Sequence, residues 1–258
     1  MLITPRRLNS DRYGDNFSTQ DVDGCLLQVV PFLKPIIDIQ THQYIGADII
    51  CRVKQGRGYI VNQFHTDVNT STDCAIFYAT QLLLKTAEGL NNAKLGVKND
   101  FWFSLELTDK LISSSLINDA ICDFRALVGN HTEVFLEIID QSFHERSLDR
   151  LPTIFISDKD SIKFSLDSRK LDNIKYFRLS PCVTKVKNDH LTHRSLIEYA
   201  VRIAKRKGAM IIAEGIISVS QERALRIAGI HMMQGPLYME PMSVSDFCVH
   251  MKKYTCKY

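Results

Sequence analysis

The sequence lacks any CxxC pair and any cysteine spacing typical of a zinc site. Its seven cysteines are an odd number and are scattered along the chain. Disulfide frameworks in small secreted proteins use paired cysteines, and structural zinc sites use closely spaced ones. The pattern therefore favours reduced thiols, and we expect a cytoplasmic protein.

The chain also lacks a long apolar run and a strong net charge. The most apolar early run, residues 26–37, is interrupted by Pro31, Lys34 and Pro35 and is about half as long as a membrane-spanning helix. No signal-peptide pattern precedes it. A formal charge of +3 over 258 residues is too small to predict a nucleic-acid partner. With 45% hydrophobic and 24% charged residues, the composition is that of a globular protein. We expect no membrane partner and no direct binding of nucleic acid.

Strand-length apolar runs alternate with longer amphipathic segments over most of the chain. Residues 1–24 are polar and lack this pattern, so we expect a flexible extension followed by a single domain over 25–258. The predicted strands cover 29–39, 44–53, 101–108, 133–139, 161–167, 175–180, 209–215 and 230–235, and the predicted helices cover 72–89, 109–127, 191–207 and 218–228. Strands that alternate with helices predict an α/β fold with a largely parallel sheet.

Polar side chains stand near the ends of these predicted strands. In α/β barrels the functional groups come from the carboxyl ends of several strands, which meet on one face. The residues at these ends are Asp48, Glu106, Glu137, Asp140, Asp167, Arg178, Glu214 and Gln234. They predict a functional site, although strand ends are also polar simply because they reach solvent.

Several segments between about residue 29 and residue 242 match one known order of motifs. They include FLKPIIDIQTHQYIGADIICRV at 32–53, FSLELT at 103–108, LEIID at 136–140, YFRLSPCVT at 176–184 and IIAEGIISVSQERALRIAGIHMMQGPLYMEPM at 211–242. In this order they resemble the EAL domain family, the bacterial cyclic di-GMP phosphodiesterases and their inactive relatives. The resemblance implies a modified (β/α)8 TIM-like barrel whose first strand runs antiparallel to the others.

The resemblance also implies a chemistry, in which two Mg²⁺ or Mn²⁺ ions and a basic group hydrolyse one phosphodiester bond of cyclic di-GMP. Such ions require hard oxygen ligands. At the matching positions the chain has Asp48 in place of Glu, Glu106 in place of Asn, and the acids Glu137 and Asp167. These four are the metal candidates, and together they could hold a single cation.

Other matching positions have lost the family's residue. Ser168 replaces the second aspartate of a pair, and Arg178 replaces a lysine and holds its proton too firmly to act as a base. Ser180 replaces a further aspartate, and Ile217 replaces a glutamate. Only ten residues separate Asp167 from Arg178, which predicts a shortened loop. Because each such loss commonly lowers a rate by powers of ten, we expect no catalytic residues and little or no phosphodiesterase activity.

The retained positions admit two interpretations. Pro35, Arg52, Glu214 and Gln234 are candidates for binding cyclic di-GMP without hydrolysis. The acids and the glutamine could instead satisfy buried donors at the barrel mouth. For Arg178 we expect neutralisation of the neighbouring acids rather than a phosphate contact, because these acids would otherwise repel one another.

We therefore expect a degenerate EAL barrel that controls gene expression, motility or adhesion by binding a regulatory protein. We also expect an isolated barrel with no attached sensor or cyclase domain, as such a role would suit. No cofactor is expected, and Mg²⁺ or Mn²⁺ only with residual activity. The alternatives are a cyclic di-GMP receptor and a weak cyclic di-GMP phosphodiesterase.

Overall fold

A computed structural model describes residues 28–61, 71–95, 100–107, 111, 114–138, 153–157 and 174–255. The extension expected over 1–24 lies outside these ranges. So do Asp140, Asp167, Ser168 and the strand predicted over 161–167. None of the helices in the described ranges combines the length and the apolar character that a bilayer crossing requires.

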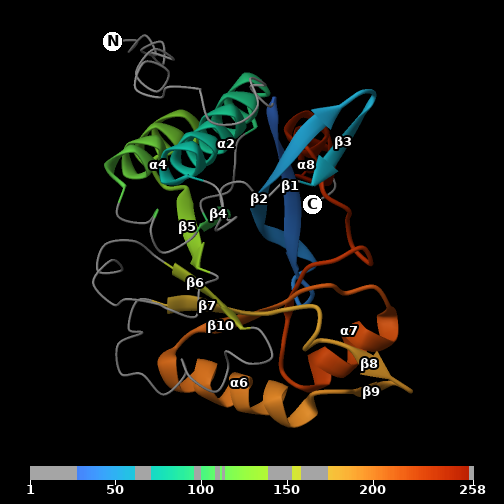
Figure 1. Cartoon of the computed structure of the whole chain (residues 1–258). Coiled ribbons are helices and arrows are strands. Elements are labelled where there is room, and N and C mark those ends of the chain that lie inside the picture. Colours follow the sequence, from blue (N-terminus) through green and yellow to red (C-terminus); the bar gives the residue numbers. More distant parts are fainter. Residues whose placement is uncertain are drawn as a thin grey trace.

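The strands of the described residues close into a barrel (Figure 1). Its members are β1 (Val29–Asp38), β2 (Gln43–Gln55), β4 (Trp102–Leu107), β5 (Glu133–Ile138), β6 (Thr153–Ser157), β7 (Ile174–Leu179), β10 (Met210–Ala213) and β11 (Met232–Met233). From β2 through β4 to β11 every neighbouring pair is parallel. Strand β1 lies between β11 and β2 and is antiparallel to both. The fold is thus the modified TIM-like barrel that the resemblance to the EAL domain family implied.

Helices cover the outside of this barrel. They are α2 (Thr72–Asn92), α4 (Ser115–Val128), α6 (Arg194–Lys207), α7 (Val219–Ile227) and α8 (Val244–Thr255). Figure 1 shows α2 and α4 together on one side of the curled sheet and α6 and α7 on the other. Strands β3 (Gly58–Val61) and β12 (Met242–Ser243) extend the sheet, and β8 (Val186–Lys187) pairs with β9 (His190–Leu191) in a separate hairpin.

Successive side chains of each strand point alternately out of and into the barrel, and this alternation positions the candidate site. Outward-facing residues such as Leu105 pack against the helices. The inward-facing residues include an apolar layer of Ile36, Trp102, Phe135, Tyr176 and Ile212. Two residues further toward the mouth, the inward positions are polar: Lys34, Ser104, Glu137, Arg178 and Glu214. A polar layer thus lies above an aromatic layer inside the barrel.

The strand between β5 and β7 differs from the expected one. Strand β6 occupies this place and pairs with both neighbours. It ends at Ser157, so twenty residues lie between Ser157 and Arg178, instead of the ten counted from Asp167 to Arg178. The ten-residue count from Asp167 therefore does not measure the connection from β6 to β7, and it no longer argues against activity.

Three helix boundaries also differ. Helix α4 begins at Ser115, after the N-cap residue Ser114, rather than at residue 109. Helix α2 continues beyond Gly89, which was expected to end it, to Asn92. A Cβ at Gly89 would lie 2.7 Å from Cγ1 of Val244, so this glycine permits the close approach of α8. Helix α6 begins at Arg194 rather than at Leu191, because Leu191 belongs to β9. Helix α6 does end at Gly208 in the left-handed conformation, as predicted.

Candidate functional site

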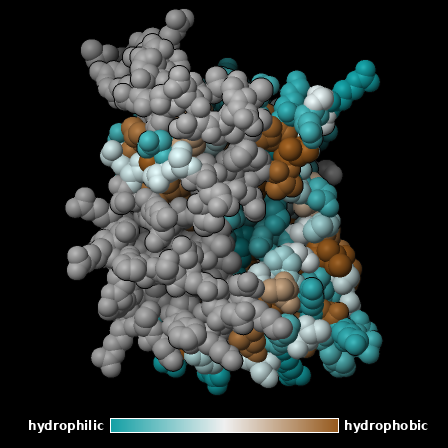
Figure 2. Space-filling model, in the orientation of Figure 1, coloured by the Kyte–Doolittle hydropathy of each residue, from teal (hydrophilic) through white to brown (hydrophobic). Residues whose placement is uncertain are grey.

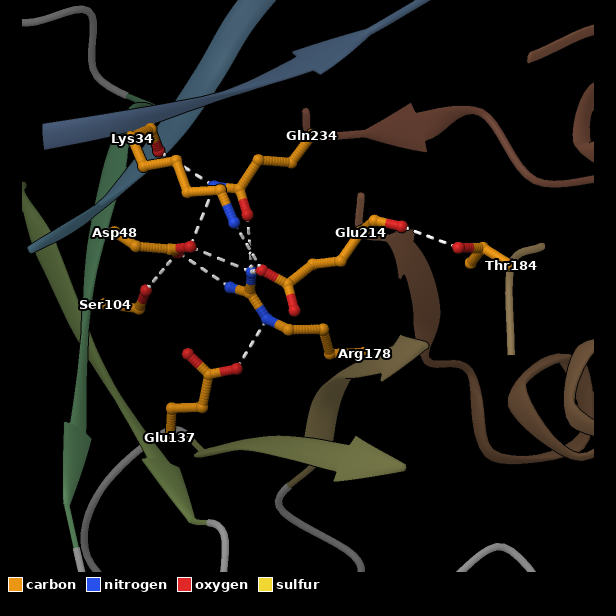
Figure 3. Close-up of polar contacts among 8 residues, drawn as sticks. All are labelled: Lys34, Asp48, Ser104, Glu137, Arg178, Thr184, Glu214 and Gln234. Atoms are coloured by element: carbon orange, nitrogen blue, oxygen red, sulfur yellow. Dashed lines mark hydrogen bonds and ion pairs between the residues drawn. The ribbon is translucent and has the colours of Figure 1, made fainter. Parts of the chain in front are cut away.

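A buried guanidinium occupies the centre of the polar layer (Figure 3). Arg178 extends from β7 and is only 1% exposed. Its Nη2 donates to Oδ1 of Asp48 at 2.7 Å, and its Nη1 donates to Oδ2 of the same carboxylate at 2.9 Å. This is the bidentate geometry in which an arginine binds a carboxylate most strongly.

Two further acids approach the same guanidinium. The Nε of Arg178 lies 2.5 Å from Oε1 of Glu137, although its N–H is not directed at that oxygen, so the contact is an ion pair rather than a hydrogen bond. Oε1 of Glu214 lies 3.4 Å from Nη1 and 2.7 Å from Nζ of Lys34. Arg178 therefore neutralises the neighbouring acids, as the sequence analysis expected.

The carboxylate of Asp48 is fully occupied within the barrel. Ser104 donates to Oδ1 at 2.5 Å, and Nε2 of Gln234 donates to Oδ2 at 2.8 Å. With the two bonds from Arg178, each oxygen accepts two hydrogen bonds, which is its usual capacity. Gln234 completes the network, since its Oε1 accepts from Nη1 at 3.0 Å and its Nε2 also donates to the carbonyl of Lys34 at 2.9 Å.

The protonation of this network follows from burial and charge. Burial disfavours the ionised form of Asp48, but Arg178 outweighs it and lowers the pKa of Asp48. Burial likewise disfavours the charged guanidinium, but the three acids raise the pKa of Arg178, so it stays protonated. For Glu137, burial raises the pKa well above its usual range, and Arg178 only partly opposes that shift.

Glu106 is the acid of this site that lies outside the network. It stands on β4 in register with Glu137 of β5, and it is half-buried. Burial, Glu214 and Asp48 together raise the pKa of Glu106 to about 7. Within the described part of the chain no basic side chain forms an ion pair with it. At neutral pH this carboxyl is therefore divided between its two protonation states.

The arrangement does not fit a divalent cation. Mg²⁺ and Mn²⁺ are held by carboxylate oxygens that converge on one point. Here the oxygens of Asp48 are fully hydrogen-bonded and Glu137 pairs with a guanidinium, which already supplies the positive charge. Among the described residues, no three His, Cys, Asp or Glu side chains are grouped so that they could hold a metal. The fourth metal candidate, Asp167, lies outside those residues.

The ligand-binding candidates are separated by the structure. Glu214 and Gln234 belong to the Arg178 network. Arg52 points to the same side of β2 as Asp48 but lies at the rim, with its guanidinium carbon 5.9 Å from the ring centroid of Phe32. Pro35 is buried on β1 opposite Ala47, and it lies between two residues that point into the barrel, so its ring faces away from the network.

Sequence reasoning missed three members of the site. Lys34 and Ser104 could have been found by extending the two-residue alternation from Ile36 and Glu106 along their strands. Thr184 supports the site from outside the barrel, because its Oγ1 donates to the backbone oxygen of Glu214 at 2.7 Å. No pattern in the sequence indicates that contact.

Comparison with known proteins assigns the chain to a family. Residues 27–241 match the family described as EAL domain. The Escherichia coli (strain K12) protein "Probable cyclic di-GMP phosphodiesterase PdeD" is 21% identical over 238 residues, which cover 84% of this chain and 42% of that relative. The chain thus spans less than half the length of this curated relative.

Solved structures show the same fold. The EAL enzyme Bd1971 in its cGMP-bound form superposes with a TM-score of 0.67 at 16% identity, over 85% of this chain and 64% of that one. Bacillus subtilis YkuI, a protein with an EAL domain in complex with cyclic di-GMP and calcium, has a TM-score of 0.65 at 12% identity, over 83% and 55% of the two chains. The family match over residues 27–241 and the shared barrel fold agree, and the chain belongs to the EAL domain family.

Proposed function

We propose that this chain is a regulatory EAL domain of cyclic di-GMP-related bacterial signalling that lacks phosphodiesterase activity and acts by binding a protein partner. The processes it would control are gene expression, motility or adhesion. Its family membership supports the signalling context. The observation that carries the proposal is the guanidinium of Arg178, buried between the carboxylates of Asp48 and Glu137.

The chemistry of that arrangement opposes hydrolysis. Attack of water on a phosphodiester needs a group that activates the water and a cation that stabilises the developing charge. Arg178 cannot accept a proton at any physiological pH, and its charge is already neutralised by the acids around it. The oxygens of Asp48 in turn have no free lone pair for a metal ion. The charged groups of the site therefore pair with one another.

An activity assay tests this proposal. Full-length protein is incubated with cyclic di-GMP and Mn²⁺, and linear dinucleotide is quantified by chromatography. We expect no product above the protein-free control. Product that disappears in Glu137→Ala would establish the alternative of a weak phosphodiesterase. Glu106 is the observation that favours this alternative, because a pKa of about 7 suits a general base.

Partner capture tests the regulatory role directly. The full chain is immobilised and exposed to bacterial lysates from several growth conditions, and bound proteins are identified by mass spectrometry. We expect one specific partner that is not retained by the heat-denatured chain. Recovery of no specific protein under any condition would count against the role.

A cyclic di-GMP receptor is the second candidate function, favoured by the position of Arg52 at the rim. Its guanidinium lies outside the Arg178 network and could contact a phosphate. Calorimetric titration, with and without Ca²⁺, would detect binding that is lost in Arg52→Ala and retained in Arg202→Ala, since Arg202 is exposed on α6. The absence of heat at high micromolar ligand would eliminate this candidate.

We place the protein in the cytoplasm. None of the cysteines in the described ranges forms a disulfide, although five are present there: Cys51, Cys74, Cys122, Cys182 and Cys248. Cysteines of this number without disulfides are typical of a reducing compartment. Cell fractionation of the tagged chain would check the assignment.

A further inference from the structure

Three aliphatic side chains are strongly exposed on α7 and on the loop before it. Ile217 is 71% exposed, Val219 68% and Ile227 76%, the highest values among the exposed large hydrophobic residues of the described chain. Val219, Arg223 and Ile227 are four residues apart and so lie in one line along the helix. Gln221 and Leu225, on the opposite face, are buried.

Hydrogen bonds hold this exposed line in place. The side chain of Gln221 donates through Nε2 to the carbonyls of Thr184 at 3.0 Å and Gly215 at 3.2 Å, and its Oε1 accepts from the N–H of Ile217 at 2.9 Å. Ser218 caps the helix by accepting from the N–H of Gln221. Because the loop and the helix are tied together, a partner would meet a preformed surface and lose little entropy in ordering it.

Positive charge surrounds the apolar line. Arg223 and Arg226 are exposed on α7, and the β8–β9 hairpin, which contacts α7, adds the exposed Lys187. The acid of α7, Glu222, accepts a hydrogen bond from Tyr238 at 2.9 Å, and the hairpin contributes one acid, Asp189. Figure 2 shows apolar and hydrophilic side chains intermingled over the region where Figure 1 places α7 and this hairpin.

We propose that Ile217, Val219, Arg223, Arg226 and Ile227, here called the α7 surface, dock an acidic amphipathic helix of a protein partner. The inference rests on the proposed regulatory function and names the face that would serve it. Side chains four residues apart form a ridge into which the apolar side chains of a second helix can pack. Acidic residues flanking that apolar face would pair with the two arginines.

An anionic membrane is the alternative ligand of the α7 surface, but the residues of that surface favour a protein partner. Helices that lie in a membrane interface usually carry Trp, Phe or Leu on the apolar face. The exposed apolar residues of α7 are only Val219 and Ile227, and Arg223 stands between them. A lipid surface would have to accommodate that guanidinium beside the acyl chains, whereas a carboxylate of a partner helix can pair with it.

A peptide selection tests the α7 surface. A phage-displayed library of helical peptides is panned on the intact chain and counter-selected on the double variant Val219→Ser/Ile227→Ser. We expect enriched peptides with net negative charge and apolar residues every three to four positions. By fluorescence anisotropy the best peptide should bind the double variant and Arg223→Glu/Arg226→Glu about 10-fold more weakly than the wild type.

The control is Val249→Ser, which removes a valine that is 53% exposed on α8; it should bind the peptide normally. Circular dichroism should show that all variants are folded, since the changed residues are exposed. Enrichment of no peptide, or of peptides without acidic residues, would overturn the inference. So would binding of the wild type to phosphatidylglycerol vesicles that Arg223→Glu/Arg226→Glu abolishes.

Lysate capture with the same variants separates this inference from the proposed function. If Val219→Ser/Ile227→Ser captures the wild-type partner as well as the wild type does, the regulatory role stands and the α7 surface is the wrong face. If the variant loses that partner while Val249→Ser keeps it, both are supported. Hydrolysis of cyclic di-GMP by the wild type would refute the proposed function and leave the peptide result unaffected.

Discussion

Arg178 and Asp48, 130 residues apart in the sequence, form a bidentate ion pair across the inside of the barrel, with N–O distances of 2.7 and 2.9 Å. Glu137 lies at the other edge of the same guanidinium. The barrel thus supplies its own cation at the level where its strand-end acids meet.

Removal of the guanidinium should strongly destabilise the fold. Arg178→Met would leave the buried carboxylate of Asp48 without its bidentate partner, and breaking a buried ion pair on one side typically costs about 3–5 kcal/mol. Urea unfolding at pH 7 would measure the loss. Arg202→Met, at an exposed position, should change the free energy of unfolding by less than about 0.5 kcal/mol. Equal stabilities for the two variants would refute the central role of Arg178.

Divalent cations should distinguish Arg178→Ala from the wild type. In the variant, Asp48, Glu137, Glu106 and Glu214 face one another without the guanidinium, so Mn²⁺ should bind and raise the unfolding temperature. The wild type should show no such increase. The matched control adds Glu137→Gln to the variant, which should abolish the effect. A Mn²⁺-dependent increase in the wild type would show that the intact site accepts a metal.

The pH dependence of stability should change in Glu106→Gln. The pKa of Glu106 is raised from 4.5 to about 7 on folding, so the native state binds more protons than the unfolded state between these values. Its contribution to stability is therefore complete below about pH 4.5 and is lost as the pH rises through about 7. Because glutamine does not titrate, the variant should be similar to the wild type at pH 5 and more stable by about 2–3 kcal/mol at pH 8.

Urea unfolding at several pH values would measure this difference. Glu133→Gln, at the exposed ion pair with Lys175, is the control and should show no comparable rise with pH. A difference between Glu106→Gln and the wild type that does not vary with pH would contradict the raised pKa of Glu106.

Gly89→Ala should destabilise the protein, although alanine usually favours a helix by about 1 kcal/mol. The new Cβ would lie 2.7 Å from Cγ1 of Val244, so α2 and α8 would have to separate. We expect a loss of about 1–3 kcal/mol by thermal or urea unfolding. In a double-mutant cycle with Val244→Ala, the loss caused by Gly89→Ala should largely disappear. Greater stability of the single variant would contradict the close contact.

Much of the fold could be predicted because it depends on local patterns. The alternation in β2 and β4 and the glycine after α6 identify these elements from neighbouring residues alone. Strand β6 could not be found in this way. The segments 153–157 and 161–167 both have the apolar pattern of a strand, and only pairing with β5 and β7 selects the first.

The sequence by itself determined which chemical groups stand at the strand ends, including Asp48, Glu137 and Arg178, because the two-residue alternation of a strand is local. Only the tertiary structure decided that these groups neutralise one another and that Glu106 stays outside their network. Hydrogen bonds and ion pairs depend on distances across the barrel, and these distances are set by strand pairing rather than by neighbouring residues. The role of Gly89 likewise could not be predicted from neighbouring residues, because it depends on the packing of α8 against α2.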